Sequence, residues 1–191
     1  MRKVLATTLL LTAFLLQACS EQPSAAYTKP GNSPPAQAEV RPEVPLLLKD
    51  LDGDGTNETI AGQRFDKVTY RNLVVRTEAG KELLRIDNPP GVIVNVIVGK
   101  AGAPAPVLIV AMTGGPDGHM LTGYMYDKAA DKMAPLVWQG ETKNYITGLA
   151  RADENLGTIV VSKKSSDGKS FVDTSYRVIG QVLSPLKAIP Q

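Results

Sequence analysis

Residues 106–114 read PVLIVAMTG, an apolar run that begins at a proline and ends at a glycine. A short run of this kind, rich in β-branched residues and bounded by Pro and Gly, is typical of a β-strand. Similar runs lie on both sides of it, separated by turns rich in Gly, Asp and Lys, and they cover residues 68–77, 91–99, 120–127, 145–150, 157–164 and 171–179. Because no helical period interrupts them from residue 46 onward, the sequence predicts an all-β fold.

The predicted strands recur in three units. The last strand of each unit reads ELLRI from residue 82, APLVW from residue 134 and VLSPL from residue 182. A period of about fifty residues with four strands is typical of a β-propeller blade. We therefore expect about twelve antiparallel strands in three propeller-like units of four strands, forming an open or partial β-propeller. Because closed propellers have about four to eight blades, a β-sandwich or a β-barrel is the alternative.

The first eighteen residues have the pattern of a signal peptide. Two basic residues precede an uncharged run from Val4 to Leu16, which has signal-peptide length and is too short for a membrane-spanning helix. The run leads into LLQAC at residues 15–19, which resembles the lipobox of bacterial lipoproteins. The resemblance implies that residues 1–18 are removed and that Cys19, the only cysteine, is lipidated. The alternative is an ordinary secretory signal with a chance cysteine.

Lipidation at Cys19 implies a protein anchored to a bacterial membrane on its extracytoplasmic side, facing the periplasm or the cell surface. Residues 19–45 are rich in Pro and Ala and offer little to bury, so we expect a disordered tether there. An ordered arm against the domain is the alternative. Residues 46–190 are expected to form the all-β domain. Without the signal peptide, basic and acidic residues number 19 each, and this neutral balance argues against a nucleic-acid partner.

Residues 50–59 read DLDGDGTNET and form an acidic loop. Its carboxylates stand at positions one, three, five and nine of the loop, and they belong to Asp50, Asp52, Asp54 and Glu58. Alternate residues of a tightly curled loop can direct oxygens at one Ca²⁺ ion, and the backbone carbonyl of Thr56 can add another. The intervening glycines permit the positive φ angles that such curling needs. The sequence therefore predicts one calcium site, with a plain Asp/Gly turn as the alternative.

The loop does not fit an EF-hand, because its twelfth position, where that motif needs a bidentate Glu, is Ala61. Its spacing resembles the calcium-binding hairpin loop of FG-GAP and VCBS repeat proteins, which has the form D-x-D-x-D-G-x-x-D and occurs in integrin-like propeller blades. The resemblance implies that the four carboxylates bind Ca²⁺. The equivalent loops of the other two units read GKAGAPAP and RADENLG and lack most of these ligands, so we expect one ion.

Few residues in this sequence could perform catalysis. His119 is the only histidine, so the chain cannot form a two-histidine zinc site. A Ser-His-Asp triad could use His119, but no GxSxG motif supports one. The aromatic residues Tyr124, Tyr126, Trp138 and Tyr145 could form a ligand surface, and a place in the sheet core is the alternative for them.

Together these features predict a calcium-stabilised, non-catalytic binding module on a lipid anchor, with a protein or glycan partner. The absence of a recognisable nucleophile and base favours this class over an enzyme. A cell-envelope hydrolase or accessory enzyme, with the acidic loop near its active site, is the alternative.

Overall fold

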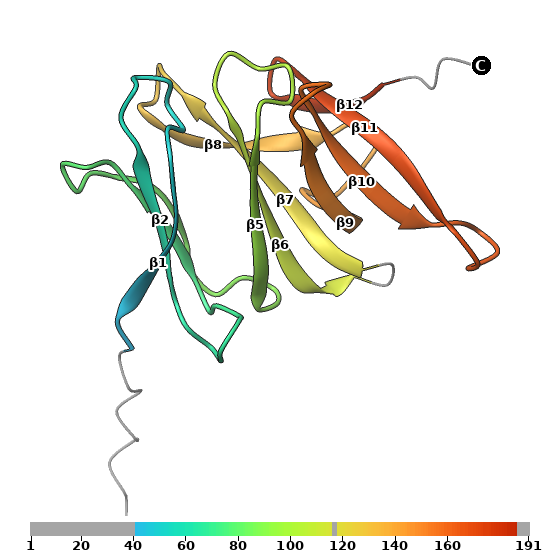
Figure 1. Ribbon diagram of the computed structural model, residues 1–191, viewed down its shortest axis with the longest axis horizontal. Helices are drawn as coiled ribbons and strands as arrows, with labels where there is room; N and C mark the ends of the chain where they lie inside the picture. Colours follow the sequence, from blue (N-terminus) through green and yellow to red (C-terminus); the bar gives the residue numbers. More distant parts are fainter. Residues whose placement is uncertain (1–40, 116–117, 187–191) are drawn as a thin grey trace, which may run out of the picture. The chain divides into compact units, whose positions relative to one another are not determined.

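The computed structural model describes residues 41–115 and 118–186, which we call the described residues. All regular elements in them are β-strands, and there are twelve (Figure 1). The prediction of an all-β fold with about twelve strands is confirmed. No helix in the described residues has the length and apolarity needed to cross a membrane. The predicted signal peptide, Cys19 and the predicted tether up to residue 40 lie outside the described residues.

The first four strands form an antiparallel sheet in chain order. They are β1 (Glu43–Lys49), β2 (Glu58–Gln63), β3 (Leu73–Arg76) and β4 (Glu82–Ile86). We call this the first sheet. Because β1 begins at Glu43, the last residues of the predicted tether belong to the sheet, and the domain starts slightly earlier than residue 46.

The other eight strands form one continuous sheet. They are β5 (Ile93–Gly99), β6 (Val107–Gly115), β7 (Gly118–Asp127), β8 (Lys132–Trp138), β9 (Ile146–Asp153), β10 (Thr158–Lys164), β11 (Phe171–Ile179) and β12 (Val182–Pro185). Neighbours along the chain pair antiparallel from β5 to β8 and again from β9 to β12. These two groups of four correspond to the second and third predicted units.

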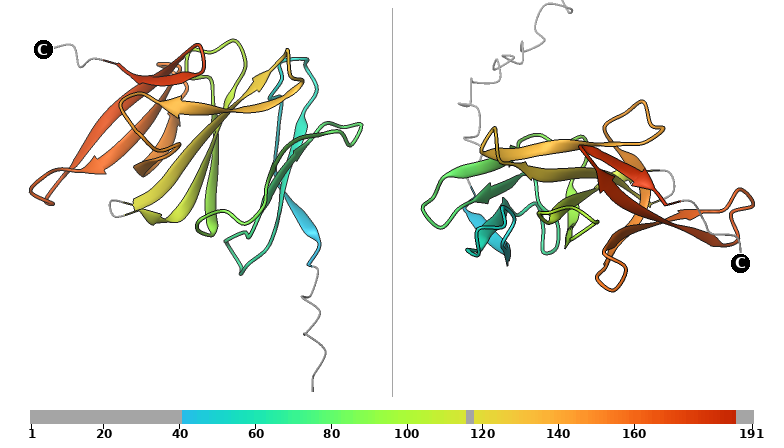
Figure 2. Two further views of the ribbon diagram at one scale, coloured as in Figure 1. Left: turned by 180° about the vertical axis from the view of Figure 1, so that it is seen from behind. Right: turned by 90° about the horizontal axis from the view of Figure 1, so that it is seen from above.

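Two backbone pairings join these groups and close a barrel. β8 pairs with β12 in parallel, where Trp138 lies opposite Leu183, and Figure 2 shows β8 running across to β12 at the red end of the chain. β7 pairs with β9 antiparallel, where His119 lies opposite Gly148. The strands β7 to β12 therefore form a closed six-stranded barrel. Because propeller blades do not share such pairings, the structure supports the barrel alternative and not the propeller arrangement.

Glycines permit the junction between β7 and β9. Gly148 has a φ of +151°, and a Cβ placed on it would lie 2.7 Å from Val161 Cγ1 and 2.8 Å from the carbonyl oxygen of Ser162. A Cβ on Gly118 would lie 2.9 Å from the carbonyl oxygen of Gly148. Real Cβ atoms do not approach other atoms this closely, so the barrel closes here only because these side chains are absent.

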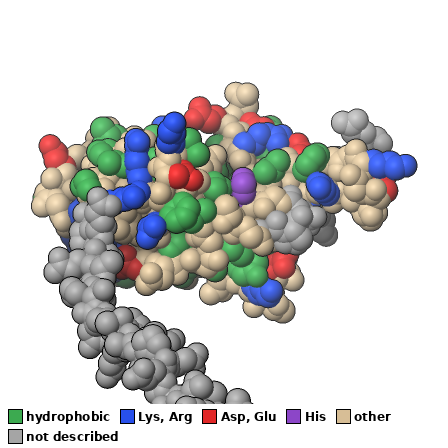
Figure 3. Space-filling model, turned by 90° about the horizontal axis from the view of Figure 1, so that it is seen from below, with side chains coloured by type: hydrophobic (Ala, Val, Ile, Leu, Met, Phe, Trp, Pro, Cys, Tyr) green, Lys and Arg blue, Asp and Glu red, His purple; other side chains and the backbone are tan. Residues whose placement is uncertain are grey.

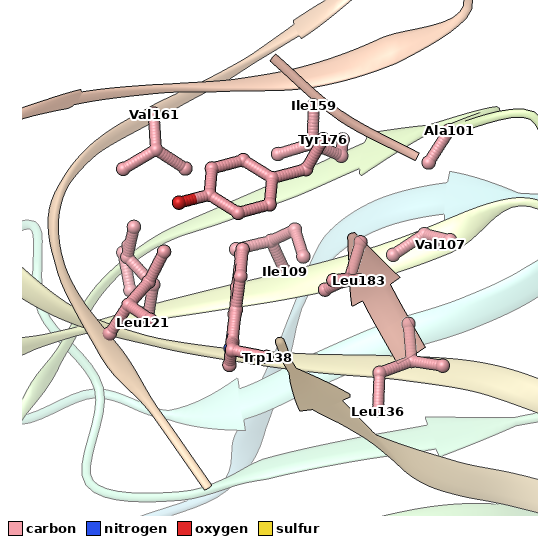
Figure 4. Close-up of a cluster of buried hydrophobic side chains, with 12 residues drawn as sticks. Ala101, Val107, Ile109, Leu121, Leu136, Trp138, Ile159, Val161, Tyr176 and Leu183 are labelled. Carbon is pink, nitrogen blue, oxygen red and sulfur yellow. The ribbon is translucent and has the colours of Figure 1, made fainter. Parts of the chain in front are cut away.

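Strand β6 is buried on both faces. Val107, Ile109 and Ala111 belong to the hydrophobic cluster that β6 shares with the barrel strands, part of which is shown in Figure 4. The alternate residues Leu108 and Val110 belong to a second cluster, which β6 shares with the first sheet. A strand buried on both faces needs apolar residues at every position, which explains why PVLIVAMTG does not alternate between apolar and polar residues.

The outer face of the first sheet carries a network of ion pairs. Arg76 Nη1 lies 2.5 Å from Glu43 Oε2, and Arg85 Nη2 lies 2.5 Å from Glu82 Oε2. The hydrogen bonds from the guanidinium groups lower the pKa of both glutamates. Basic and acidic side chains are also interspersed, rather than segregated, on the face of the molecule shown in Figure 3.

Replacing Arg76 with alanine is expected to lower the free energy of unfolding at pH 7 by about 1 kcal/mol or less, because the pair with Glu43 is partly exposed. The folded-state pKa of Glu43 lies below its unfolded value, so this contribution is present above the unfolded pKa and is lost as the pH falls through the folded one. Urea denaturation at pH 7 and pH 3 should show the difference between wild type and variant shrinking at the lower pH. A difference that stays equal at both pH values would contradict this assignment.

Candidate functional site

The acidic loop connects β1 to β2 and curls around its own carboxylates. Both oxygens of Asp50 accept backbone hydrogen bonds, from the amides of Gly53 at 2.7 Å and Gly55 at 3.1 Å. These glycines have φ values of +81° and +91°, in the left-handed region that glycine adopts readily. Asp52 Oδ1 accepts from the Asp54 amide at 3.0 Å. The local sequence therefore folds the loop so that successive carboxylates turn inward.

Three of the predicted ligands come together in this loop. Asp50, Asp52 and Glu58 each place one carboxylate oxygen within 4.8 Å of the other two. Oxygens bound to one Ca²⁺ ion lie within about 5 Å of one another, because each is roughly 2.3–2.6 Å from the ion. The spacing of the three oxygens therefore suits a single Ca²⁺ ion.

The two remaining predicted ligands lie at the exposed tip of the loop. Asp54 is not part of the group of three carboxylates. Its Oδ1 instead accepts a hydrogen bond from the backbone amide of Thr56 at 2.6 Å. A carbonyl ligand from Thr56 and a carboxylate ligand from Asp54 therefore stay predictions.

Glu58 is the most unusual member of the group, because it is a carboxylate with an exposed fraction of only 1%. Its Oε2 accepts a hydrogen bond from the backbone amide of Leu51 at 2.6 Å. Burial raises the pKa of Glu58, and the negative charges of Asp52 and Asp54 raise it further, against the opposing effect of the backbone hydrogen bonds. A bound cation would favour the ionised form of this carboxylate, since opposite charge at close range lowers a carboxyl pKa.

Tyr126, one of the aromatic residues considered for a ligand surface, lies near the acidic loop. The hydroxyl of Tyr126 donates a hydrogen bond to Asp131 Oδ1 at 2.8 Å. This bond, helped by burial and by the charges of Asp131, Asp52 and Asp54, raises the pKa of Tyr126 to about 12. Asp131 also pairs with Lys81, which connects the β7–β8 turn to the turn before β4. No spacing in the sequence indicated the pair of Lys81 with Asp131, because the two residues come from separate turns.

The four aromatic residues considered for a ligand surface differ in their burial. Trp138 is completely buried inside the barrel, where its ring meets the ring of Tyr176 edge to face at 5.1 Å between centroids (Figure 4). Trp138 therefore takes the alternative place in the core, because β8 directs this side chain into the barrel. Tyr124, Tyr126 and Tyr145 are partly buried and pack against the cluster shared with the first sheet.

The other predicted features add no second site among the described residues. The imidazole of His119, on β7, makes no hydrogen bond and no ion pair in the described part of the chain. Cys19 lies outside that part. Within residues 41–115 and 118–186, no group of potential metal ligands other than Asp50, Asp52 and Glu58 comes together. Comparisons of this chain with protein-family models, with curated proteins and with solved structures give no match.

Proposed function

We propose that this chain is a calcium-stabilised, non-catalytic binding module, held by a lipid on Cys19 at the extracytoplasmic side of a bacterial membrane. The observation that carries the calcium part is the convergence of Asp50, Asp52 and Glu58 within 4.8 Å. The resemblances of the loop to FG-GAP and VCBS repeats and of LLQAC to a lipobox support the same proposal.

The ion's proposed role is to order the connection between β1 and β2. β1 is an edge strand of the first sheet, so its backbone pairs with β2 alone. The loop already satisfies several of its own backbone amides through Asp50, Asp52 and Asp54. An ion at this position therefore adds stability to a formed loop and is not needed to create the fold.

Calcium is expected to stabilise the purified chain modestly. With a dissociation constant of about 10⁻⁴–10⁻³ M, as in extracellular sites, 1 mM Ca²⁺ adds about 0.4–1.4 kcal/mol to the free energy of unfolding. Chemical denaturation with CaCl₂ and with EDTA measures this increment, and calorimetric titration counts the sites.

Turnover of cell-envelope substrates that is lost in His119→Ala would instead favour the hydrolase alternative.

The Asp52→Asn change should remove the calcium increment, because it takes away one of the three converging carboxylates. Asp66→Asn is a matched control, since Asp66 also caps backbone amides in an exposed loop but lies outside the acidic group. The control variant should keep the full increment. A flat calcium titration of the wild-type chain, or an increment that survives in Asp52→Asn, contradicts the calcium proposal.

Replacing Cys19 with alanine is expected to move the protein from the membrane fraction to the soluble fraction of the cell, because two or more acyl chains supply the anchoring. Cell fractionation measures this shift, and labelling with a radioactive fatty acid detects the lipid itself. Ser24→Ala, in the same predicted tether, should stay labelled and membrane-bound. A wild-type chain that takes up no label would indicate an ordinary secretory signal.

A further inference from the structure

A hollow separate from the acidic loop's carboxylates lies where three parts of the fold meet. The end of β1, the loop from β5 to β6 and the turn between β9 and β10 all lie at the upper end of the strands in Figure 1. The hollow has a volume of about 250 Å³ and is lined by Lys49, Val98, Gly99, Lys100, Pro106 and Glu154. Ligand pockets for drug-sized molecules occupy roughly 300–1,000 Å³, so this space suits a smaller ligand.

The charged side chains of the hollow are exposed and have no polar partner among the described residues. Lys49, Lys100 and Glu154 make no side-chain hydrogen bond and no ion pair in the described residues. Charged residues nearby on β9 and β10 are paired, as Arg151 is with Asp173 at 2.7 Å and Lys163 with Glu141 at 3.7 Å. Two ammonium groups and one carboxylate thus border the same hollow without partners in the described part of the chain.

The backbone on both sides of Lys100 is closely packed. A Cβ on the preceding Gly99 would lie 2.8 Å from the Ala152 Cβ, so the backbone there packs directly against β9. The following Ala101 is fully buried, has a φ of +25°, and accepts a hydrogen bond from the Val178 amide at 2.8 Å. A non-glycine residue with this backbone conformation is strained, and strain of this kind tends to occur at binding sites. The backbone of Lys100 is therefore held between two packed residues, and its side chain is exposed at the rim of the hollow.

Part of the lining of the hollow is apolar. Val98 and Pro106 give the hollow aliphatic surface beside its charged groups. A complementary ligand carries a carboxylate for the lysines, an ammonium group for Glu154 and a small apolar side chain. All three properties belong to an amino acid or a short peptide with free ends.

We infer that this hollow binds the free ends of a small apolar amino acid or dipeptide, with the carboxylate on Lys49 and Lys100 and the ammonium group on Glu154. This assigns a ligand class to the proposed binding role and rests on that role, but it does not depend on the calcium site. Charge-assisted hydrogen bonds fix the orientation of the ligand, and the aliphatic lining limits the size of its side chain.

The test uses the dipeptide alanylalanine with the ¹⁵N-labelled full chain in EDTA, followed by NMR. Saturable shifts are expected at the amides of Gly99, Lys100 and Glu154. The dipeptide amide, which lacks the carboxylate, and the N-acetyl dipeptide, which lacks the ammonium group, should each bind about tenfold more weakly, as expected for loss of one charge-assisted hydrogen bond.

Three variants separate the contacts. Lys100→Gln should weaken dipeptide binding about tenfold, whereas the exposed Lys67→Gln should not change it. Glu154→Gln should weaken binding of the dipeptide but not of its N-acetyl derivative. The inference is overturned if no saturable shift occurs at these amides, if all three peptides bind alike, or if inorganic phosphate binds as tightly as the dipeptide. Because the titration is done in EDTA, a failed calcium experiment leaves this result unaffected.

Discussion

Replacing Trp138 with alanine is expected to lower the free energy of unfolding by about 3–5 kcal/mol. Trp138 is completely buried and packs with Tyr176, Leu136 and Leu183 inside the barrel. Removing its ring takes away the largest fully buried side chain of the described residues and leaves a cavity. Since proteins of this size are stable by about 5–15 kcal/mol, the variant should be close to unfolding at physiological temperature.

Urea denaturation followed by circular dichroism measures this effect. Val137→Ala is the matched control, because Val137 is the preceding residue of β8 and its exposed fraction is 47%. The control should lose less than about 1 kcal/mol, since surface changes are usually small. Equal losses in the two variants would show that Trp138 does not lie in the barrel core.

Replacing Gly148 with alanine should also destabilise the protein strongly, by about 3 kcal/mol, as the sum of backbone strain and overpacking. The φ of +151° is unfavourable for a residue with a side chain, and the new Cβ would meet Val161 and the backbone of Ser162. The effect should be concentrated at the β7–β9 junction. Hydrogen exchange at those amides among His119, Met120 and Leu121 that face β9 should therefore rise more than exchange elsewhere in β7.

The Gly140→Ala variant separates the effect of backbone strain from the effect of steric overlap. Gly140 also has a positive φ, +84°, but a Cβ there would meet no atom within 4 Å. Its loss should be about 1–2 kcal/mol, the usual penalty for a left-handed residue with a side chain. If both alanine variants lose the same stability, the close packing around Gly148 is not what closes the barrel.

The sequence predicts the strands well because their pattern is local. Runs such as PVLIVAMTG contain their own boundaries, and the antiparallel neighbours follow from short connections. The barrel closure is different, because it pairs β7 with β9 and β8 with β12, strands that are not consecutive. The residues near Gly118 and Gly148 do not indicate which distant segment of the backbone packs against these two glycines. The same repeat of four strands therefore suits a propeller and a barrel equally.

The acidic loop was predictable for the same local reason, since Asp50 and Asp52 stand close to Glu58 in the chain. The near-complete burial of Glu58 was not, because it depends on neighbours from other parts of the fold. Trp138 shows the opposite case, where an aromatic residue on a strand could face either side. Which face of β8 is interior depends on the closure of the barrel, in which β8 pairs with the distant β12.

The burial of strand β6 on both faces affects how the protein unfolds. Because its two faces belong to two hydrophobic clusters, neither the first sheet nor the barrel can separate from it without exposing apolar surface. We therefore expect residues 43–185 to melt in one cooperative transition, with equal calorimetric and van't Hoff enthalpies, rather than as independent subdomains. A proteolytic nick between β4 and β5 should likewise leave two fragments that stay associated until both unfold together.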